Sequence, residues 1–204
     1  MARAQAHALE AFVAATVLLA SVTFALQVTA VTPLTASTSS QHIENQQSAI
    51  TEGLLAAAAE NGTLKRTALL TYPQNGTFRD ADAEGYYIDG GPPTAFGEML
   101  NQTFLANGIA FNVYVNYLRD SEARRTIRMV YMGQPSDHAI SQTRFLTLYD
   151  NDTLYAPDGS GSTVAQSETL GEVDAGSETM FYTPDADPGT LYGVIEVEVV
   201  VWRM

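Results

Sequence analysis

The hydrophobic and polar positions of this chain change pattern twice along its length. A polar head, Met1–Glu10, leads into an apolar segment without any charge, Ala11–Val31. As an α-helix rising about 1.5 Å per residue, that segment would be roughly 31 Å long, close to the ~30 Å hydrocarbon thickness of a bilayer. We therefore expect a helix that can cross a membrane once.

A second helical pattern follows a short stretch of small and polar residues. Thr32–Ser40 contains Pro33, which can kink a helix or begin a new one. Between Gln41 and Glu60 apolar residues recur at helical spacing, and Asn61-Gly62 is a stop signal. We expect an amphipathic helix beside the membrane over residues 32–61, with an apolar face formed by Ile43, Ile50, Leu54 and Ala57.

From residue 62 to 204 the pattern changes mainly to period two, and turn residues multiply, which predicts a β-rich domain. One helix is predicted after Thr94, which would cap it, and Asn107-Gly108 would end it. Tyr155–Gly176 is rich in Gly, Ser, Asp and Glu and is predicted to be an exposed loop. The predicted strands are Thr67–Tyr72, Gly85–Ile88, Ile109–Leu118, Thr126–Met132, Arg144–Tyr149 and Leu191–Trp202.

Two of these strands carry the clearest signals. Ile109–Leu118 alternates apolar residues with Asn112, Tyr114 and Asn116, as expected of a half-buried strand. Leu191–Trp202 is rich in β-branched residues, which predicts a central or well-paired strand with its acidic face in water. Trp202 is interpreted as part of the core or as a plug at the sheet edge.

The polar head bears on whether the apolar segment is removed or retained. A secretory signal has a positive n-region, 7–15 apolar residues and small residues at the cut. Val28-Thr29-Ala30 matches such a cut site, but the apolar run is longer, and Glu10 lies where positive charge is expected. A helix that stays on the protein, as a single-pass anchor, is therefore favoured over cleavage.

Glu10 needs water or a cationic partner, because a carboxylate is costly to bury in the bilayer. A cut after Arg3-Ala4 would free an α-amino group on Gln5, a few residues from Glu10. That amine would supply the positive partner.

The sequence Arg3-Ala4-Gln5, followed by Glu10 and the apolar helix, resembles the class III signal peptides of archaeal type IV pilin-like proteins, in particular those of haloarchaea. The resemblance implies that a prepilin peptidase cuts between Ala4 and Gln5 and that the apolar helix remains. This family usually places its glutamate five residues into the mature chain. Glu10 is sixth from Gln5, and a cut after Gln5 would restore that spacing.

Composition and charge narrow the function classes. The net charge is −13, with 23 acidic residues against ten basic ones, of which only Lys65 is lysine. Acidic, lysine-poor surfaces resemble those of proteins from concentrated salt, where charge repulsion is strongly screened. Nucleic-acid binding needs a basic patch, whereas the basic cluster here is interrupted by acidic residues and is predicted to be a solvated turn. It comprises Arg119, Arg124, Arg125 and Arg128.

The sequence offers little chemistry beyond this. There is no cysteine, the three histidines lack the spacing of a zinc site, and no nucleophile or nucleotide-binding motif occurs. Asp150-Asn151-Asp152 lacks the remaining ligands of a calcium loop. We therefore expect no enzymatic activity, no cofactor and no metal. Four N-x-[ST] sequences are candidate N-glycosylation sites, at Asn61, Asn75, Asn101 and Asn151.

Charge asymmetry gives the orientation. Arg3 precedes the apolar segment, and no Lys or Arg occurs between Val31 and Lys65, so the N-terminus should be cytoplasmic and the rest translocated. We expect an α+β protein with a leader (1–4), a membrane or filament spine helix (5–31), an amphipathic helix (32–61) and an extracellular β-rich head (62–204). The resemblance to the pilin-like family implies that this head packs on the C-terminal half of the long helix.

The expected function is that of a major or minor structural subunit of a type IV pilus-like surface filament. Its partners would be the membrane, a prepilin peptidase, other pilin-like subunits and glycans, and not nucleic acid. The alternative is a single-pass, membrane-anchored extracellular binding protein that does not polymerise.

Overall fold

The computed structural model describes residues 2–118, 123–175, 181–186 and 189–204, without the side chains of 2–6, 28–40, 174 and 175. It divides into two compact units, Met1–Asn45 and Gln46–Met204. Helix α1 (Ala2–Glu60) is helical through Pro33 and ends where the sequence predicts, since Asn61 forms a turn and Gly62 adopts a φ of +74°.

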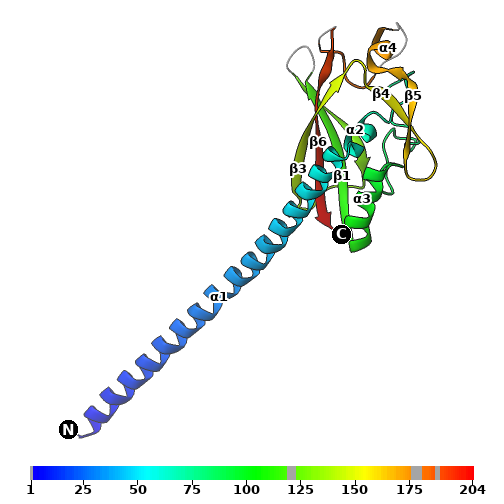
Figure 1. The fold of residues 1–204 in the computed structure, drawn as a ribbon. Helices are drawn as coiled ribbons and strands as arrows, with labels where there is room; N and C mark the ends of the chain where they lie inside the picture. The colour runs from blue at the N-terminus through cyan, green and yellow to red at the C-terminus, as the bar shows by residue number, and fades with distance from the viewer. Residues whose placement is uncertain (1, 119–122, 176–180, 187–188) are drawn as a thin grey trace. The chain divides into compact units, whose positions relative to one another are not determined.

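The second unit is built on an antiparallel four-stranded sheet in the order β2-β1-β6-β3 (Figure 1). The strands are β1 (Ile109–Leu118), β2 (Arg124–Tyr131), β3 (Ile140–Tyr149) and β6 (Leu191–Arg203). Val197 of β6 pairs with Val115 of β1 on one side and with Arg144 of β3 on the other. The expectations of an α+β fold and of a central C-terminal strand are therefore confirmed.

The core lies on one face of this sheet. Leu55 and Ala58, near the end of α1, are 1% and 0% exposed and belong to the same buried cluster as the sheet residues. The predicted packing of the β-rich region on the C-terminal half of the long helix is confirmed, and the contact lies at the last turns of α1. The inner-face residues are Phe111, Val113, Val115, Leu146, Leu148, Ile195, Val197, Val199 and Val201.

Helix α3 (Ala95–Thr103) forms as the sequence predicts. The Thr94 hydroxyl accepts a hydrogen bond from the Gly97 amide at 3.1 Å, which satisfies one of the free donors at the helix start. A Cβ on Gly97 would lie 1.9 Å from the Pro92 carbonyl, so this close approach requires glycine. A 3₁₀ turn, η1 (Leu105–Asn107), follows and ends at Gly108 in the left-handed region.

Two predicted strands are wrong. The first part of Thr67–Tyr72 belongs to helix α2 (Thr63–Ala68), because Leu64 and Ala68 recur at helical spacing and are both buried. Gly85–Ile88 contributes only one bridge, from Tyr87 to Val130. In both segments packing against the sheet decides the conformation, and the local alternation does not.

The prediction of a loop over Tyr155–Gly176 is also wrong as far as Ala175, while Gly176 lies outside the described residues. This segment contains most of β4 (Thr153–Pro157), all of β5 (Thr163–Thr169), which pairs with β4, and helix α4 (Leu170–Ala175). Most β5 side chains are exposed or half-buried. Polar composition therefore reflects a solvated hairpin here, and not a lack of backbone pairing.

Candidate functional site

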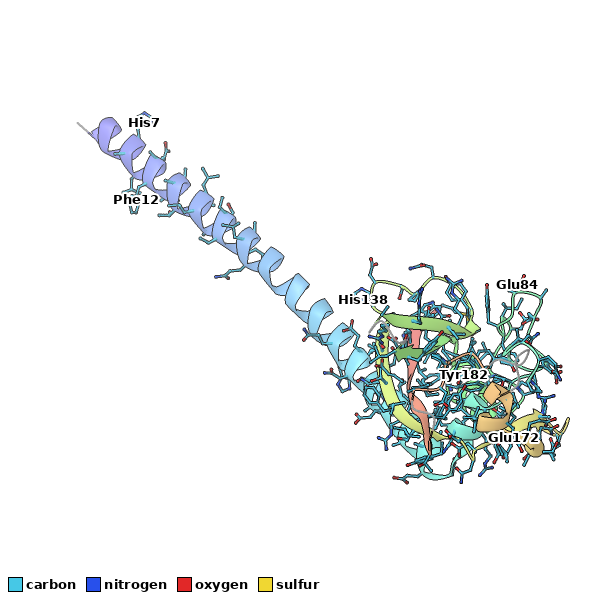
Figure 2. The ribbon with its side chains drawn as sticks, turned by 90° about the horizontal axis from the view of Figure 1, so that it is seen from above. His7, Phe12, Glu84, His138, Glu172 and Tyr182 are labelled. Carbon is cyan, nitrogen blue, oxygen red and sulfur yellow. The ribbon has the colours of Figure 1, made fainter. Side chains whose placement is uncertain are left out.

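The first candidate site is the apolar part of α1. His7–Gln27 is long and apolar enough to cross a membrane, with a mean hydropathy of 2.0, and none of it is buried. Leu18 is 66% exposed, and Phe24 is 69% exposed. Within its own unit, the labelled side chains of His7 and Phe12 project from α1 with no other element against them (Figure 2). This segment is therefore a candidate membrane anchor.

Hydroxyl groups inside this apolar segment are satisfied by the helix itself. Thr16 Oγ1 donates to the Val13 carbonyl at 2.8 Å, and Ser21 Oγ donates to the Leu18 carbonyl at the same distance. Because an unpaired polar group is expensive in hydrocarbon, these bonds lower the cost of burying the segment in lipid or against another helix. The segment can thus carry small polar residues without a partner outside the chain.

Glu10 has a neighbour that sequence reasoning missed. His7 Nδ1 lies 3.5 Å from Glu10 Oε2, and both side chains are about four-fifths exposed, at 80% and 79%. Positions three apart face each other on a helix, so the signal was present in the sequence. A protonated His7 would give Glu10 a positive partner. The side chains of Arg3, Ala4 and Gln5 lie outside the described residues.

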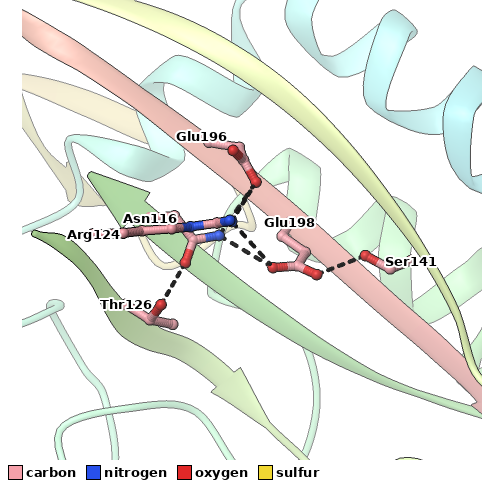
Figure 3. A network of polar contacts seen from close by, with 6 residues as sticks. All are labelled: Asn116, Arg124, Thr126, Ser141, Glu196 and Glu198. Atoms are coloured by element: carbon pink, nitrogen blue, oxygen red, sulfur yellow. Dashed lines mark hydrogen bonds and ion pairs between the residues drawn. The ribbon is translucent and has the colours of Figure 1, made fainter. Parts of the chain in front are cut away.

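The second candidate site lies on the outer face of the sheet, where side chains from all four strands form one polar network (Figure 3). Glu196 and Glu198 come from β6, and the strand register places Asn116 of β1 opposite Glu196 and Thr126 of β2 opposite Asn116. Thr126 Oγ1 donates to Asn116 Oδ1 at 2.6 Å. Asn116 Nδ2 donates to Glu198 Oε2 at 3.1 Å.

Charged contacts complete this network. Arg124 Nη2 lies 2.7 Å from Glu196 Oε1 and 3.9 Å from Glu198 Oε2. Ser141 of β3 donates to the other oxygen of Glu198, at 2.7 Å. Two carboxylates that alternate on one strand face would repel each other, and the guanidinium offsets this repulsion. Since Arg124 is 56% exposed, solvent screens the ion pairs, and each is worth at most about 1 kcal/mol.

These contacts correct two expectations about charge. The basic cluster is not a turn, because Arg124, Arg125 and Arg128 lie in β2, while Arg119 lies outside the described residues. Glu196 and Glu198 are only partly exposed and are engaged by side chains of three other strands. The network therefore ties the strands together and does not present a free acid or base.

Beside the network the sheet face is apolar. Leu118, Phe145 and Val194 are 68%, 66% and 51% exposed, and together with Arg124 and Glu196 they line a shallow hollow of about 210 Å³. Exposed apolar groups with a polar rim are typical of interaction surfaces. The residues that line this hollow come from all four strands of the sheet, and β6 is distant in sequence from the others, which is why the sequence did not reveal the hollow.

At the other end of the same face, Asn112 is fully buried. Its amide nitrogen donates to the Gly133 carbonyl at 2.9 Å, and its oxygen accepts the Met132 amide at 2.8 Å. Asn112 also donates to the Tyr114 hydroxyl, whose pKa is raised mainly by burial. The prediction that this face of β1 is open to water fails at Asn112 and Asn116, which hold neighbouring chain segments.

The remaining candidates show no sign of metal chemistry. His42 and His138 are exposed, and the part of the chain that the structure describes contains no group of three or more acidic or histidine side chains able to hold a metal ion. In the Asp150-Asn151-Asp152 segment, Asp152 Oδ2 lies 2.6 Å from Lys65 Nζ. That carboxylate is therefore committed to an ion pair with α2.

The four candidate glycosylation sites differ in setting. Asn61, Asn75 and Asn151 are exposed in turns, whereas Asn101 is half-buried within α3.

No curated protein and no solved structure matches the chain. The model of one family, described as a family of unknown function (DUF7288), matches residues 3–201. This match begins in the polar head, includes the apolar segment of α1 and ends in β6. Because it covers almost the whole chain, the protein belongs to the DUF7288 family of unknown function.

Proposed function

We propose that the protein is a pilin-like structural subunit of a type IV pilus-like surface filament. It is inserted in the membrane as a precursor, trimmed near Gln5 by a prepilin peptidase, and assembled through the apolar part of α1. The observation that carries the proposal is the contrast along this helix. His7–Gln27 is not buried at all, whereas Leu55 of the same helix is 1% exposed.

An apolar surface of this length needs a cover, and either lipid or the same helix of neighbouring subunits can supply it. Lipid tails are as apolar as leucine, so moving from lipid to a neighbouring helix brings little further hydrophobic gain. Close packing and polar contacts must drive assembly. Small residues that permit close approach are spread along the segment, at Ala14, Ala15, Ala20, Ser21 and Ala25.

Glu10 supplies the polar contact. A carboxylate at the membrane surface is stable while water solvates it, but packing of helices removes that water. Cations near it would then be the α-amine created by the cut before Gln5 and, when protonated, His7 at 3.5 Å. Pairing with the amine of its own or a neighbouring subunit would favour the processed, assembled form over the free precursor.

Orientation follows from the charge distribution. Arg3 lies on the cytoplasmic side, and the acidic β-rich region is translocated. An anionic membrane surface would repel that region, which leaves the apolar helix as the attachment. The protein would be a single-pass protein of the cell membrane, or part of an extracellular filament after assembly.

The test combines terminal mass and mutagenesis. Protein recovered from the native membrane is expected to begin at Gln5 or Ala6. Glu10→Leu should leave membrane insertion intact, because it removes a charge, and should lower the yield of sheared filaments more than tenfold. Glu52→Leu is the matched control, since Glu52 is exposed on the same helix in the second unit. Normal filaments from Glu10→Leu, or equal losses from both variants, would contradict the role of Glu10.

The apolar hollow on the outer sheet face favours a second candidate, a membrane-anchored extracellular binding protein that does not polymerise. Leu118, Phe145 and Val194 would be the contact residues of its head. An uncut N-terminus together with a monomer in detergent would support this alternative. A terminus at Val31 would instead indicate a secreted domain and contradict both functions.

A further inference from the structure

Two of the four N-x-[ST] sequences adopt the same closed turn. In Asn61-Gly62-Thr63, Asn61 Oδ1 accepts hydrogen bonds from the Thr63 amide at 2.9 Å and from the Thr63 hydroxyl at 2.6 Å. In Asn75-Gly76-Thr77, the corresponding distances are 3.1 and 2.7 Å. Each middle glycine has a positive φ, +74° and +65°, which a side chain would disfavour.

This geometry fixes the oxygen of each asparagine amide and leaves its nitrogen available. Among the described residues, neither Asn61 Nδ2 nor Asn75 Nδ2 donates a hydrogen bond, and both side chains are exposed. The turn is already formed in the folded chain, so an enzyme that recognises asparagine and the hydroxyl residue two positions later would find both groups in one orientation. Little further ordering would be required.

Asn101 has the opposite setting. It lies inside α3, its Oδ1 accepts the Gly91 amide at 2.8 Å, and it is only half-exposed. A Cβ on Gly90 would come within 2.9 Å of that same oxygen, so the loop packs tightly against this side chain. Because Asn101 is half-buried and the loop at Gly90 packs against its side chain, a large group on its nitrogen has less room than at the exposed Asn61 and Asn75.

Asn151 falls between these cases. It is exposed in the turn before β4, but its threonine, Thr153, already lies in that strand. Asp152 between them is held by Lys65 at 2.6 Å. The site is accessible without being arranged in the closed turn.

We propose that Asn61 and Asn75 are N-glycosylated, that Asn151 is modified at lower occupancy and that Asn101 is left unmodified. The donor class is a glycan joined through its anomeric carbon to a lipid phosphate. Nδ2 forms a bond to that carbon and loses one proton, while the carbon–oxygen bond to phosphate breaks and the lipid phosphate leaves with the electron pair. This inference rests on export of the β-rich region and does not depend on filament assembly.

The modified sites also restrict any assembly. Asn61 directly follows α1, and Gly62 beside it lines a hollow of about 270 Å³ that also includes Asn151 and Asp152. A glycan on Asn61 needs solvent above this hollow. Subunit contacts must therefore leave the surroundings of Asn61 and Asn75 free.

Protease cleavage at the basic and acidic residues places each candidate site on its own peptide, so the modification of each can be measured separately. Trypsin cleaves after Lys65, Arg66, Arg79, Arg119, Arg144 and Arg203, which places Asn75, Asn101 and Asn151 on peptides 67–79, 80–119 and 145–203. A glutamate-specific protease used with trypsin releases Asn61 on peptide 61–65, or on 53–65 if the glycan blocks the nearer cut. Mass spectrometry of full-length protein from the native membrane then gives the occupancy of each site.

Glycan mass is expected on the peptides carrying Asn61 and Asn75 and not on 80–119. Asn75→Gln and Thr77→Ala should each remove the glycan from 67–79, Thr77→Ser should retain it, and Asn101→Gln should leave the total mass unchanged apart from the substitution. A glycan on 80–119 with a bare 67–79, or no glycan anywhere, would overturn the inference. The N-terminal mass from the same sample tests prepilin processing separately, since a terminus at Gln5 without glycans would reject only the glycosylation.

Discussion

Helix α1 has a buried end and an exposed apolar part, and the same Leu→Ala substitution made in each part tests this difference. Leu55 is 1% exposed and packs in the core with the sheet, whereas Leu18 on the same helix is 66% exposed. Leu55→Ala removes buried methyl groups and leaves a cavity, a change that typically costs about 2–5 kcal/mol. Leu18→Ala shortens a mostly exposed side chain outside the core of the β-rich unit, so this unit should unfold as before.

The expected size of the effect follows from the size of the unit. In domains of 150–250 residues, each 1 kcal/mol lowers Tm by about 2–4 °C, so Leu55→Ala should lower Tm by between about 4 and 20 °C. The chain has one tryptophan, Trp202, which is 7% exposed. Its fluorescence in mild detergent therefore reports the unfolding of this unit during a thermal scan.

Two outcomes would contradict this difference between the two parts of α1. If Leu55→Ala changed Tm by less than about 1 °C, the end of α1 would not belong to the core of the β-rich unit. If Leu18→Ala caused an equal loss in the detergent-dispersed monomer, the apolar segment would have a partner within the chain. Either outcome would remove the contrast on which the proposed function rests.

Two further predictions concern single polar groups in the head. Burial, followed by the charges of Asp80 and Asp82, raises the pKa of Tyr87. Tyrosine in the unfolded chain ionises near pH 10, whereas folded Tyr87 stays neutral, so the free energy of unfolding should fall by up to ~1.4 kcal/mol per pH unit above pH 10. Tyr87→Phe should reduce this decrease when the free energy of unfolding is measured by urea titration at several pH values above 10. An unchanged dependence on pH would contradict the role of Tyr87. Asn112→Ala should lower the free energy of unfolding by about 2–4 kcal/mol, because the Gly133 carbonyl and the Met132 amide lose their hydrogen-bond partner, the buried Asn112 side chain. A decrease below about 0.5 kcal/mol in chemical denaturation would show that water replaces this side chain.

Several features of this protein were determined by local sequence. The length and lack of charge of Ala11–Val31 are sufficient to predict a helix that can span a membrane. The cap at Thr94 is sufficient to place the start of α3, and the stop at Gly108 ends the 3₁₀ turn η1 that follows this helix. Strict alternation with β-branched residues predicted Ile109–Leu118 and Leu191–Trp202 as strands. Each of these signals depends on residues within a few positions of one another, so no tertiary contact is needed to interpret them.

The tertiary structure decided the rest. Arg124 and Glu196 are 72 positions apart, and only the pairing of β1 between β2 and β6 brings them within 2.7 Å. This pairing, together with that of β3 with β6, forms the apolar hollow. Asn112 is buried, although its position on the polar side of an alternating strand predicted exposure. Strand order, and hence the identity of each cross-strand neighbour, depends on global packing and not on local propensity. A helix long and apolar enough to cross a membrane could therefore be predicted from the sequence, whereas the surface available to partners could not.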